Sequence, residues 1–405
     1  MGSQLPEGDP APADGSLPPD ALARGASQPL GLYLHVPFCA TRCGYCDFNT
    51  YTAGELGSPS SVGDFLAAAG SELDLAARTL GRARPLSTVF FGGGTPTMLP
   101  ADELAGLLRE VGKRFDLAPD VEVTTEANPD SVDEGYLSVL REAGFTRVSL
   151  GMQSSRSHVL EILDRTHSPG RPEEGVAAAR RAGFEHVSLD LIYGTPGETD
   201  DDWADSLQTT IRAGVDHVSA YALVVEDGTA LARKVARGEL SAPDDDVLAD
   251  RYLMADEALS HAGLGWYEVS NWAQSASSHC RHNELYWRSA DWWGIGPGAH
   301  SHVGGVRWWN VKHPSAYAAR LREGVSPAHS REVLSDHQRM EENVLLAIRL
   351  REGLDANEID GRGGEVALQL SREGLLDPTA LAQGRLVLTL TGRLLADRVV
   401  RDLLP

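Results

Sequence analysis

Short apolar runs alternate with longer amphipathic stretches from residue 29 onward. Six of these runs are rich in β-branched and aromatic residues and have the length of strands: 31–36, 87–91, 121–125, 148–152, 187–192 and 218–223. The stretches between them, such as 101–113 and 202–213, repeat apolar residues at helical spacing. Strands that alternate with helices predict an α/β fold with parallel strands and right-handed crossovers.

A weak internal repeat supports this fold class. A glycine followed shortly by a strand start recurs at Gly144, Gly183, Gly214 and, more loosely, Gly263. Each glycine stands where a helix would end, in a conformation that favours glycine. Repeats of about 30–40 residues are typical of successive β/α units in a barrel. Ordinary helix-to-strand loops have a similar composition, and that alternative leads to the same fold class.

The pattern divides the chain into four parts. Residues 1–28 are rich in Pro, Gly, Ala and Asp, so we expect a disordered tail. Residues 29–270 are expected to form the barrel, and the aromatic-rich segment 271–330 to close it. Residues 331–405 are expected to form a small α+β, winged-helix-like domain. Within it we predict a helix over 338–349 and a hairpin-like stretch over 385–391.

Charge and cysteine usage narrow the function classes. The chain of 405 residues carries 36 basic and 58 acidic residues, a formal charge of −22, which argues against a nucleic-acid partner. Four cysteines do not make a disulfide scaffold and indicate a reducing, cytoplasmic compartment. We see no apolar run long enough to cross a membrane and no secretory signal at the N-terminus.

Three of the cysteines, Cys39, Cys43 and Cys46, have the spacing C-x3-C-x2-C. Thiolates this close in sequence can hold one metal cluster from a single loop. Iron–sulfur clusters usually have four cysteine ligands, so three would leave one iron open, as a catalytic metal requires. The alternative is a zinc site with Cys280 or a histidine as fourth ligand. Zinc sites more often use paired C-x2-C halves, and a second half is missing from the sequence.

Other candidate residues follow the predicted strands. In β/α barrels, functional residues lie at the C-terminal ends of the strands. The cysteine loop follows the first strand, and a glycine run over 92–94 follows the second. Glu126 follows the third, Gln153 follows the fourth and Asp190 lies in the fifth. We therefore expect these residues at one mouth.

The cysteine loop resembles that of the radical S-adenosylmethionine (radical SAM) enzymes. The longer string Tyr33-x-His35-x-Pro37-Phe38-Cys39 resembles the oxygen-independent coproporphyrinogen III oxidase group, and motifs at 92–97, 126–129, 151–154 and 190–196 follow in the same order. The resemblance implies a partial (β/α)6-type barrel, a 4Fe-4S cluster and bound S-adenosylmethionine. Residues implied to contact S-adenosylmethionine are Tyr33, Tyr45, Gly94, Thr95, Pro96, Glu126, Gln153, Arg165 and Asp190.

A second motif, His282-Asn283-x-x-Tyr286-Trp287, is typical of the haem chaperone branch of this group, known as HemW. Histidine is a common haem ligand, and aromatic rings can pack on a porphyrin face. The resemblance implies that His282, Tyr286 and Trp287 contact haem as cargo. A histidine among aromatic residues also fits ordinary core packing.

One difference from the oxidases of this group favours the haem chaperone branch. The oxidases of the group carry a further cysteine, C-x3-C-x2-C-x-C, and Phe48 stands there in this chain. The resemblance therefore implies a haem chaperone that delivers haem to respiratory haem proteins. Radical decarboxylation of coproporphyrinogen III, and a radical methyltransferase or cyclopropane-forming activity, are the alternatives. We expect membrane contact only through a partner, and two copies could pair as a homodimer.

Overall fold

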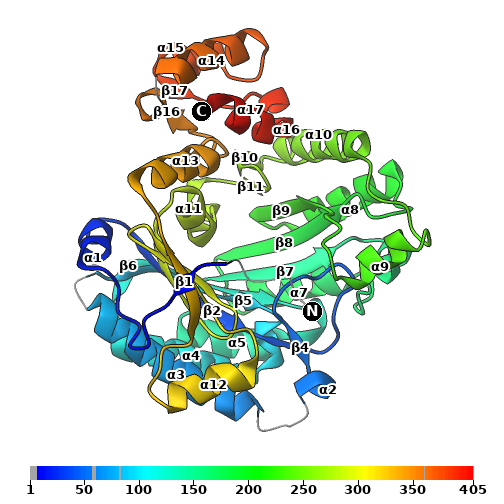
Figure 1. Cartoon of the computed structure of the whole chain (residues 1–405). Coiled ribbons are helices and arrows are strands. Elements are labelled where there is room, and N and C mark those ends of the chain that lie inside the picture. Colours follow the sequence, from blue (N-terminus) through cyan, green and yellow to red (C-terminus); the bar gives the residue numbers. More distant parts are fainter. Residues whose placement is uncertain (1–6, 57–60, 82–83, 360, 405) are drawn as a thin grey trace.

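The computed structural model describes residues 7–56, 61–81, 84–359 and 361–404 (Figure 1). Its centre is a row of six parallel strands, each joined to the next by a helical crossover, inside a 13-stranded sheet. The six strands are β2 (Leu30–Val36), β5 (Leu86–Gly93), β6 (Leu117–Ala127), β7 (Arg147–Gln153), β8 (His186–Tyr193) and β9 (His217–Ala222). All six predicted runs overlap these strands, so the α/β prediction is confirmed.

The crossover helices cover the outer face of these strands. They include α3 (Ser61–Leu80), α4 (Ala101–Arg114), α5 (Glu134–Ala143), α6 (Ser157–Ile162), α7 (Arg171–Arg181) and α8 (Asp200–Ala213). The repeated glycines mark helix ends: Gly144 and Gly214 cap α5 and α8 with φ of 111° and 73°. A residue with a Cβ is strained at such a φ, which explains the recurring glycine.

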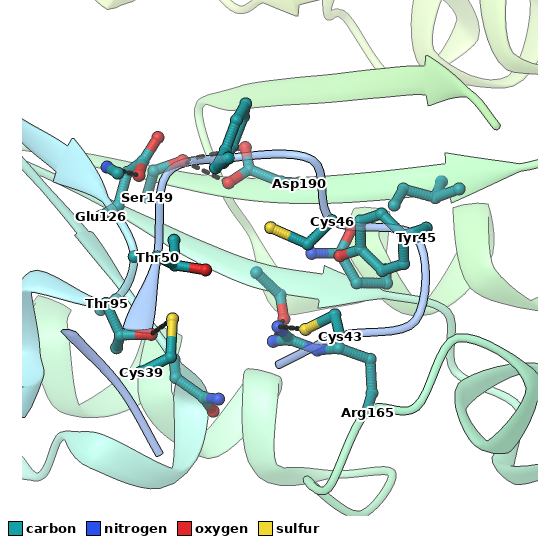
Figure 2. A pocket seen from close by; sticks show the side chains of 18 of the residues that line it. Cys39, Cys43, Tyr45, Cys46, Thr50, Thr95, Glu126, Ser149, Arg165 and Asp190 are labelled. Atoms are coloured by element: carbon teal, nitrogen blue, oxygen red, sulfur yellow. Dashed lines mark hydrogen bonds between the residues drawn. The ribbon is translucent and has the colours of Figure 1, made fainter. Parts of the chain in front are cut away.

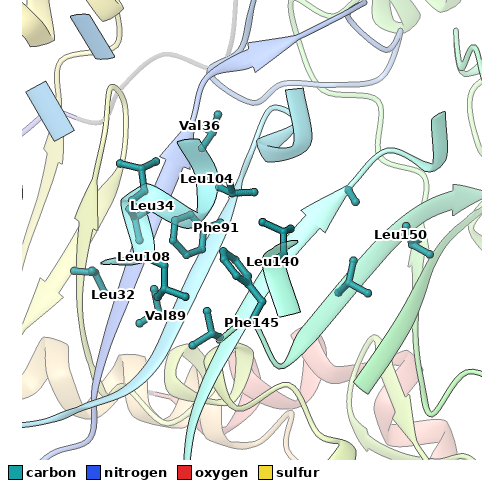
Figure 3. Packing of buried hydrophobic residues seen from close by; sticks show 14 of the residues in the cluster. Leu32, Leu34, Val36, Val89, Phe91, Leu104, Leu108, Leu140, Phe145 and Leu150 are labelled. Carbon is teal, nitrogen blue, oxygen red and sulfur yellow. The ribbon is translucent and has the colours of Figure 1, made fainter. Parts of the chain in front are cut away.

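Residues along the parallel strands alternate between the apolar core and the inner face of the sheet. Leu32 and Leu34 of β2, with Val89 and Phe91 of β5, are buried in the main apolar core together with residues of α4 and α5 (Figure 3). The residues between them face the opposite side of the sheet, because side chains alternate along a strand. That inner face is largely polar, and it surrounds the cavity described below.

The segment 271–330 widens the sheet and does not join its two ends. β12 (Asp291–Ile295) pairs in parallel with β2, and β13 (His300–Val303), β14 (Val306–Asn310) and β15 (Ala328–Val333) continue from it. At the other end β11 (Asn271–Ala273) and β10 (Gly265–Glu268) follow β9. Among the residues described, β10 and β1 (Asp9–Pro10) remain the two edges, so the expected closure of the barrel by this segment is not made by strand pairing.

The N-terminal part of the described chain is ordered, which corrects the expected tail. β1 pairs antiparallel with β15, and α1 (Pro19–Gly25) buries Ala21 completely. Small residues allow this close packing: a Cβ on Gly304 would lie 1.9 Å from the carbonyl oxygen of Ala21. Residues 1–6 lie outside the described residues.

The C-terminal residues form a unit with its own apolar core, built from side chains between Val344 and Leu403. Its elements are α13 (Asp336–Ala347), β16 (Leu354–Asp355), α14 (Gly361–Arg372), α15 (Pro378–Ala382), β17 (Arg385–Leu386), α16 (Leu390–Leu394) and α17 (Ala396–Leu403). α13 confirms the predicted helix. The predicted hairpin over 385–391 is wrong: β17 pairs with β16, and Thr389 caps α16 by accepting the Gly392 N–H at 3.0 Å.

This unit is joined to the barrel at α10 (Asp245–His261), as Figure 1 shows for the orange and red elements. Arg393 donates to Asp256 at 2.8 Å and its guanidinium lies 4.3 Å from the centre of the Trp266 ring. None of the helices in the described part of the chain is long and apolar enough to span a membrane.

Candidate cofactor site

A cavity of about 600 Å³ opens at the C-terminal ends of the parallel strands. Most of the residues predicted to hold the cofactors line it: Cys39, Cys43, Tyr45, Cys46, Gly94, Thr95, Glu126, Gln153, Arg165 and Asp190. The structure thus brings together residues that lie up to 151 positions apart in the chain, from Cys39 to Asp190. Two of the residues predicted to contact S-adenosylmethionine are not in the lining. Tyr33 bonds to His35 at 3.0 Å, and Pro96 is buried at the start of a 3-10 turn (Pro96–Met98).

Main-chain hydrogen bonds hold the cysteine loop over this cavity. The Gly44 N–H donates to Leu163 O at 3.1 Å, and the Gly44 carbonyl accepts from Leu231 N–H at 2.8 Å. On the other side Thr95 N–H donates to Phe38 O at 2.8 Å. The loop is therefore fixed to segments that follow three different strands.

The three thiols are arranged as donors to one shared group. Figure 2 shows the sulfur atoms of Cys39, Cys43 and Cys46 turned toward the same space. None of them is in a disulfide, and Arg165 Nη1 donates to Cys43 Sγ at 3.4 Å. Burial raises the pKa of Cys46 to about 11. The thiol must therefore lose its proton when it binds a cation.

The side chains fit a cluster better than a single ion. In the part of the chain that the structure describes, His, Cys, Asp and Glu side chains form no group of three or more that could hold one metal ion. The zinc alternative needs such a group. Three cysteines lining one roomy cavity suit a larger multi-iron cluster, whose ligands lie further apart.

The glycine run beside the cysteines is required by close packing. A Cβ on Gly94 would lie 2.5 Å from the carbonyl oxygen of Phe38, directly before Cys39. A Cβ on Gly93, whose φ is 107°, would lie 2.5 Å from the ring of His35. The glycines therefore let β5 approach the start of the cysteine loop, and Gly94 and Thr95 reach the cavity.

Two carboxyl groups face the interior of the barrel. Asp190 accepts hydrogen bonds from Ser149 Oγ at 2.9 and 3.0 Å, and Glu126 accepts from Gly93 N–H at 3.2 Å. Burial, followed by repulsion from Asp190, raises the pKa of Glu126 to about 8, and burial raises that of Asp190 to about 6. Such groups gain a favourable partner when a cationic ligand group enters the cavity.

The motif of His282 lies in α11 (Arg281–Trp287), whose Asn283 lines the cavity whereas His282, Tyr286 and Trp287 do not. His282 is 1% exposed, and its ring nitrogens bond to Thr88 Oγ1 at 2.7 Å and Tyr286 Oη at 2.8 Å. Its ring also stacks on Phe90, with centroids 5.0 Å apart. Neither nitrogen is open to a metal in this arrangement, so a haem-ligand role for His282 would require both bonds to break.

A buried ion pair holds α11 in this position. Arg147 and Glu122 lie 3.2 Å apart, with side chains 1% and 5% exposed. Arg147 donates to the carbonyl oxygens of Ser278 and His279, each at 2.8 Å. Glu122 accepts the His282 N–H at 3.0 Å, which also suits a carboxylate at a helix start.

Comparisons with known proteins agree with this geometry. Residues 33–210 match the model of the radical SAM superfamily. Over 383 residues the chain is 55% identical to "Heme chaperone HemW" of Mycobacterium tuberculosis, covering 95% of this chain and 97% of the relative. The chain belongs to the HemW family. A HemW protein of Bacillus subtilis is 31% identical over 376 residues, with 91% and 97% covered.

A solved structure supports the HemW fold described here. Coproporphyrinogen III oxidase from Escherichia coli, a radical SAM enzyme, superposes with a TM-score of 0.82 and 23% identity, covering 95% of this chain and 92% of that one. At this identity the match supports the fold, an α/β partial barrel, and carries no argument on activity.

The sequence did not predict the deeper lining of this cavity. It includes Thr124, Arg147, Ser149, Ser188, His217 and Ser219. A signal was present in the strands: polar residues alternate with apolar ones at 147–151, 188–192 and 217–221. Parallel strands buried on both faces usually read as continuous apolar runs, so this alternation indicates a polar interior.

The raised pKa of Glu126 makes the stability of the folded chain depend on pH. Between its ordinary pKa of 4.5 and about 8, the folded chain keeps a proton that the unfolded chain has lost. The free energy of unfolding therefore falls as pH rises through this range. We expect Glu126→Gln to make that fall less steep, measured by urea denaturation of the cofactor-free protein at several pH values. Equal slopes for the two proteins would contradict the assignment.

Proposed function

We propose that this chain binds haem and delivers it to respiratory haem proteins, on a radical SAM barrel that carries a 4Fe-4S cluster and S-adenosylmethionine. The observation that carries the proposal is the 55% identity to the mycobacterial protein named as a haem chaperone, over nearly the full length of both chains. Phe48, at the place of a further cysteine in the oxidases, supports the same choice.

Cys39, Cys43 and Cys46 would hold the cluster, and Glu126, Gln153, Arg165 and Asp190 would surround S-adenosylmethionine. When bound, the open iron of the cluster supplies a chelation site for adjacent amino and carboxylate groups and a source of one electron. The carboxyl groups of Glu126 and Asp190 can accept hydrogen bonds from hydroxyl and amine groups, and Arg165 can donate to a carboxylate.

The cellular compartment and the partners follow from this proposed role. The chain would act in the cytoplasm, where its four unpaired cysteines stay reduced, and would meet a membrane only through the protein that receives haem. Two copies would pair as a homodimer during transfer. Sedimentation analysis with and without haem tests the pairing, since a single monomer species in both samples would remove it.

Anaerobic reconstitution of the cluster followed by haem titration tests the main proposal. We expect a shift of the Soret band that saturates at a fixed haem-to-protein ratio. A parallel assay offers coproporphyrinogen III with S-adenosylmethionine and a reductant. Absence of haem binding together with formation of protoporphyrinogen IX would refute the chaperone proposal and favour the oxidase.

A His282 variant separates ligand and packing roles. Because its two ring hydrogen bonds are buried, we expect His282→Ala to lower the free energy of unfolding by about 2 kcal/mol. We expect haem affinity to change less than the stability does, since the ring is closed off from the cavity. Denaturation curves and haem titrations on the same preparation provide both numbers. A large loss of haem affinity at unchanged stability would instead establish His282 as the haem ligand.

A further inference from the structure

Four large apolar side chains are exposed around the mouth of the cavity. Phe48 and Val224 are each 59% exposed, Met98 is 43% exposed and Tyr221 is 41% exposed. All four belong to the lining of the same cavity. We call them the apolar rim. Single exposed apolar residues are common on protein surfaces, but several gathered at one opening are typical of a binding site.

The members of the apolar rim come from opposite ends of the row of six parallel strands. Phe48 follows β2 and Met98 follows β5, whereas Tyr221 is in β9 and Val224 lies just beyond it. β2 and β9 are the first and last strands of that row. The rim therefore includes both sides of the mouth.

Contacts between the loops bring these two sides together. Tyr45, three residues before Phe48, packs on an apolar cluster that contains Leu223, the neighbour of Val224. The carbonyl of Gly44 also accepts from Leu231 N–H at 2.8 Å, which ties the cysteine loop to the segment after β9. Phe48 and Val224 thus belong to two loops that contact each other beside the cavity.

The charges beside the apolar rim restrict how a ligand can lie on it. Asp47 and Glu226 belong to the same lining, and the chain as a whole carries a formal charge of −22. The basic residues of the lining, Arg42, Arg147 and Arg165, are already bonded to Glu55, Glu122 and Cys43. Carboxylate groups of a ligand are repelled from such surroundings. A ligand with a broad apolar face and carboxylates at one edge fits if the face covers the rim and the carboxylates point to solvent. Haem has this chemistry.

We propose that haem docks on the apolar rim, with its macrocycle against Phe48 and Val224 across the cavity mouth and its propionates toward solvent. This inference rests on the proposed function, which supplies haem as the ligand. It places the cargo over the cluster and S-adenosylmethionine, and it requires no bond of His282 to break. The rim residues are surface groups, so they can be altered without opening the core.

Serine substitutions on the rim test this docking site by haem titration. Burying one large apolar side chain contributes about 1.5 kcal/mol or more, so we expect Val224→Ser and Phe48→Ser each to weaken haem binding about tenfold. Val224→Ser is the primary variant, because Phe48 lies close to a cluster ligand. Iron content, measured on every sample, should match the unaltered protein.

A matched control lies far from the cavity in the C-terminal unit. Leu368 of α14 is 52% exposed, and Leu368→Ser should bind haem like the unaltered protein. If the unaltered protein binds haem and both rim variants bind it within about twofold of that affinity, the rim is not the docking site. If the unaltered protein binds no haem, the proposed function itself fails, and the two failures are thereby distinguished.

Discussion

The Cys39→Ala variant is expected to lose the iron–sulfur cluster almost completely. Cys39 is one of three thiols that line the cavity mouth. Iron–sulfur clusters usually have four cysteine ligands, and this cluster would have only three. The variant would retain two cysteine ligands. We expect iron and sulfide to fall from about four of each per chain to a trace, together with the broad absorbance of the cluster.

The fourth cysteine provides the control for this prediction. Cys280 is buried, and its Sγ lies 3.8 Å from Glu122 Oε1 in the barrel interior. Cys280→Ala should therefore retain iron and sulfide after the same anaerobic reconstitution. Iron retained by Cys39→Ala, or lost by Cys280→Ala, would show that the ligand set differs from the one proposed.

The second large effect is expected from Arg147→Met. Its buried partner Glu122 would keep a charge without a counter-ion, and two carbonyl groups would lose their donor. Removing one partner of a buried ion pair costs about 3–5 kcal/mol. Urea denaturation of the cofactor-free protein should show a loss of this size.

An exposed ion pair serves for comparison. Arg181 and Glu134 lie 2.6 Å apart, but their side chains are 57% and 51% exposed. Arg181→Met should cost below about 1 kcal/mol, because water and ions screen such pairs. Similar losses for the two arginine variants would refute the anchoring role of Arg147. If Arg147→Met fails to fold, the double variant Arg147→Met with Glu122→Gln removes the unpaired charge and should recover soluble protein.

Local patterns in the sequence predicted most of the architecture and the cluster loop. The six parallel strands, the glycine helix ends at Gly144 and Gly214, and the spacing of Cys39, Cys43 and Cys46 each depend on residues close together in the chain. The gathering of Glu126 and Asp190 at one mouth followed from the rule that parallel strands end on the same side.

Features that depend on distant partners could not be predicted in this way. Residues 9–10 pair with 330–331, so the ordering of the N-terminal part depends on residues more than 300 positions later. The predicted hairpin failed because Arg385 and Leu386 pair with 354–355, and Thr389 starts a helix. Likewise, His282 looks like an open ligand in the motif, and only its contacts with Thr88 and Tyr286 show that its nitrogens are engaged.

The position of β12 beside β2 has a consequence for synthesis of the chain on the ribosome. β2 begins at residue 30, but one of its edges stays unpaired until residues 291–295 have emerged. α11, which enters the barrel just before β12, arrives equally late. For most of translation the nascent barrel therefore exposes an unpaired strand edge next to the cysteine loop. During that interval the edge can pair with another chain, so it needs protection from aggregation.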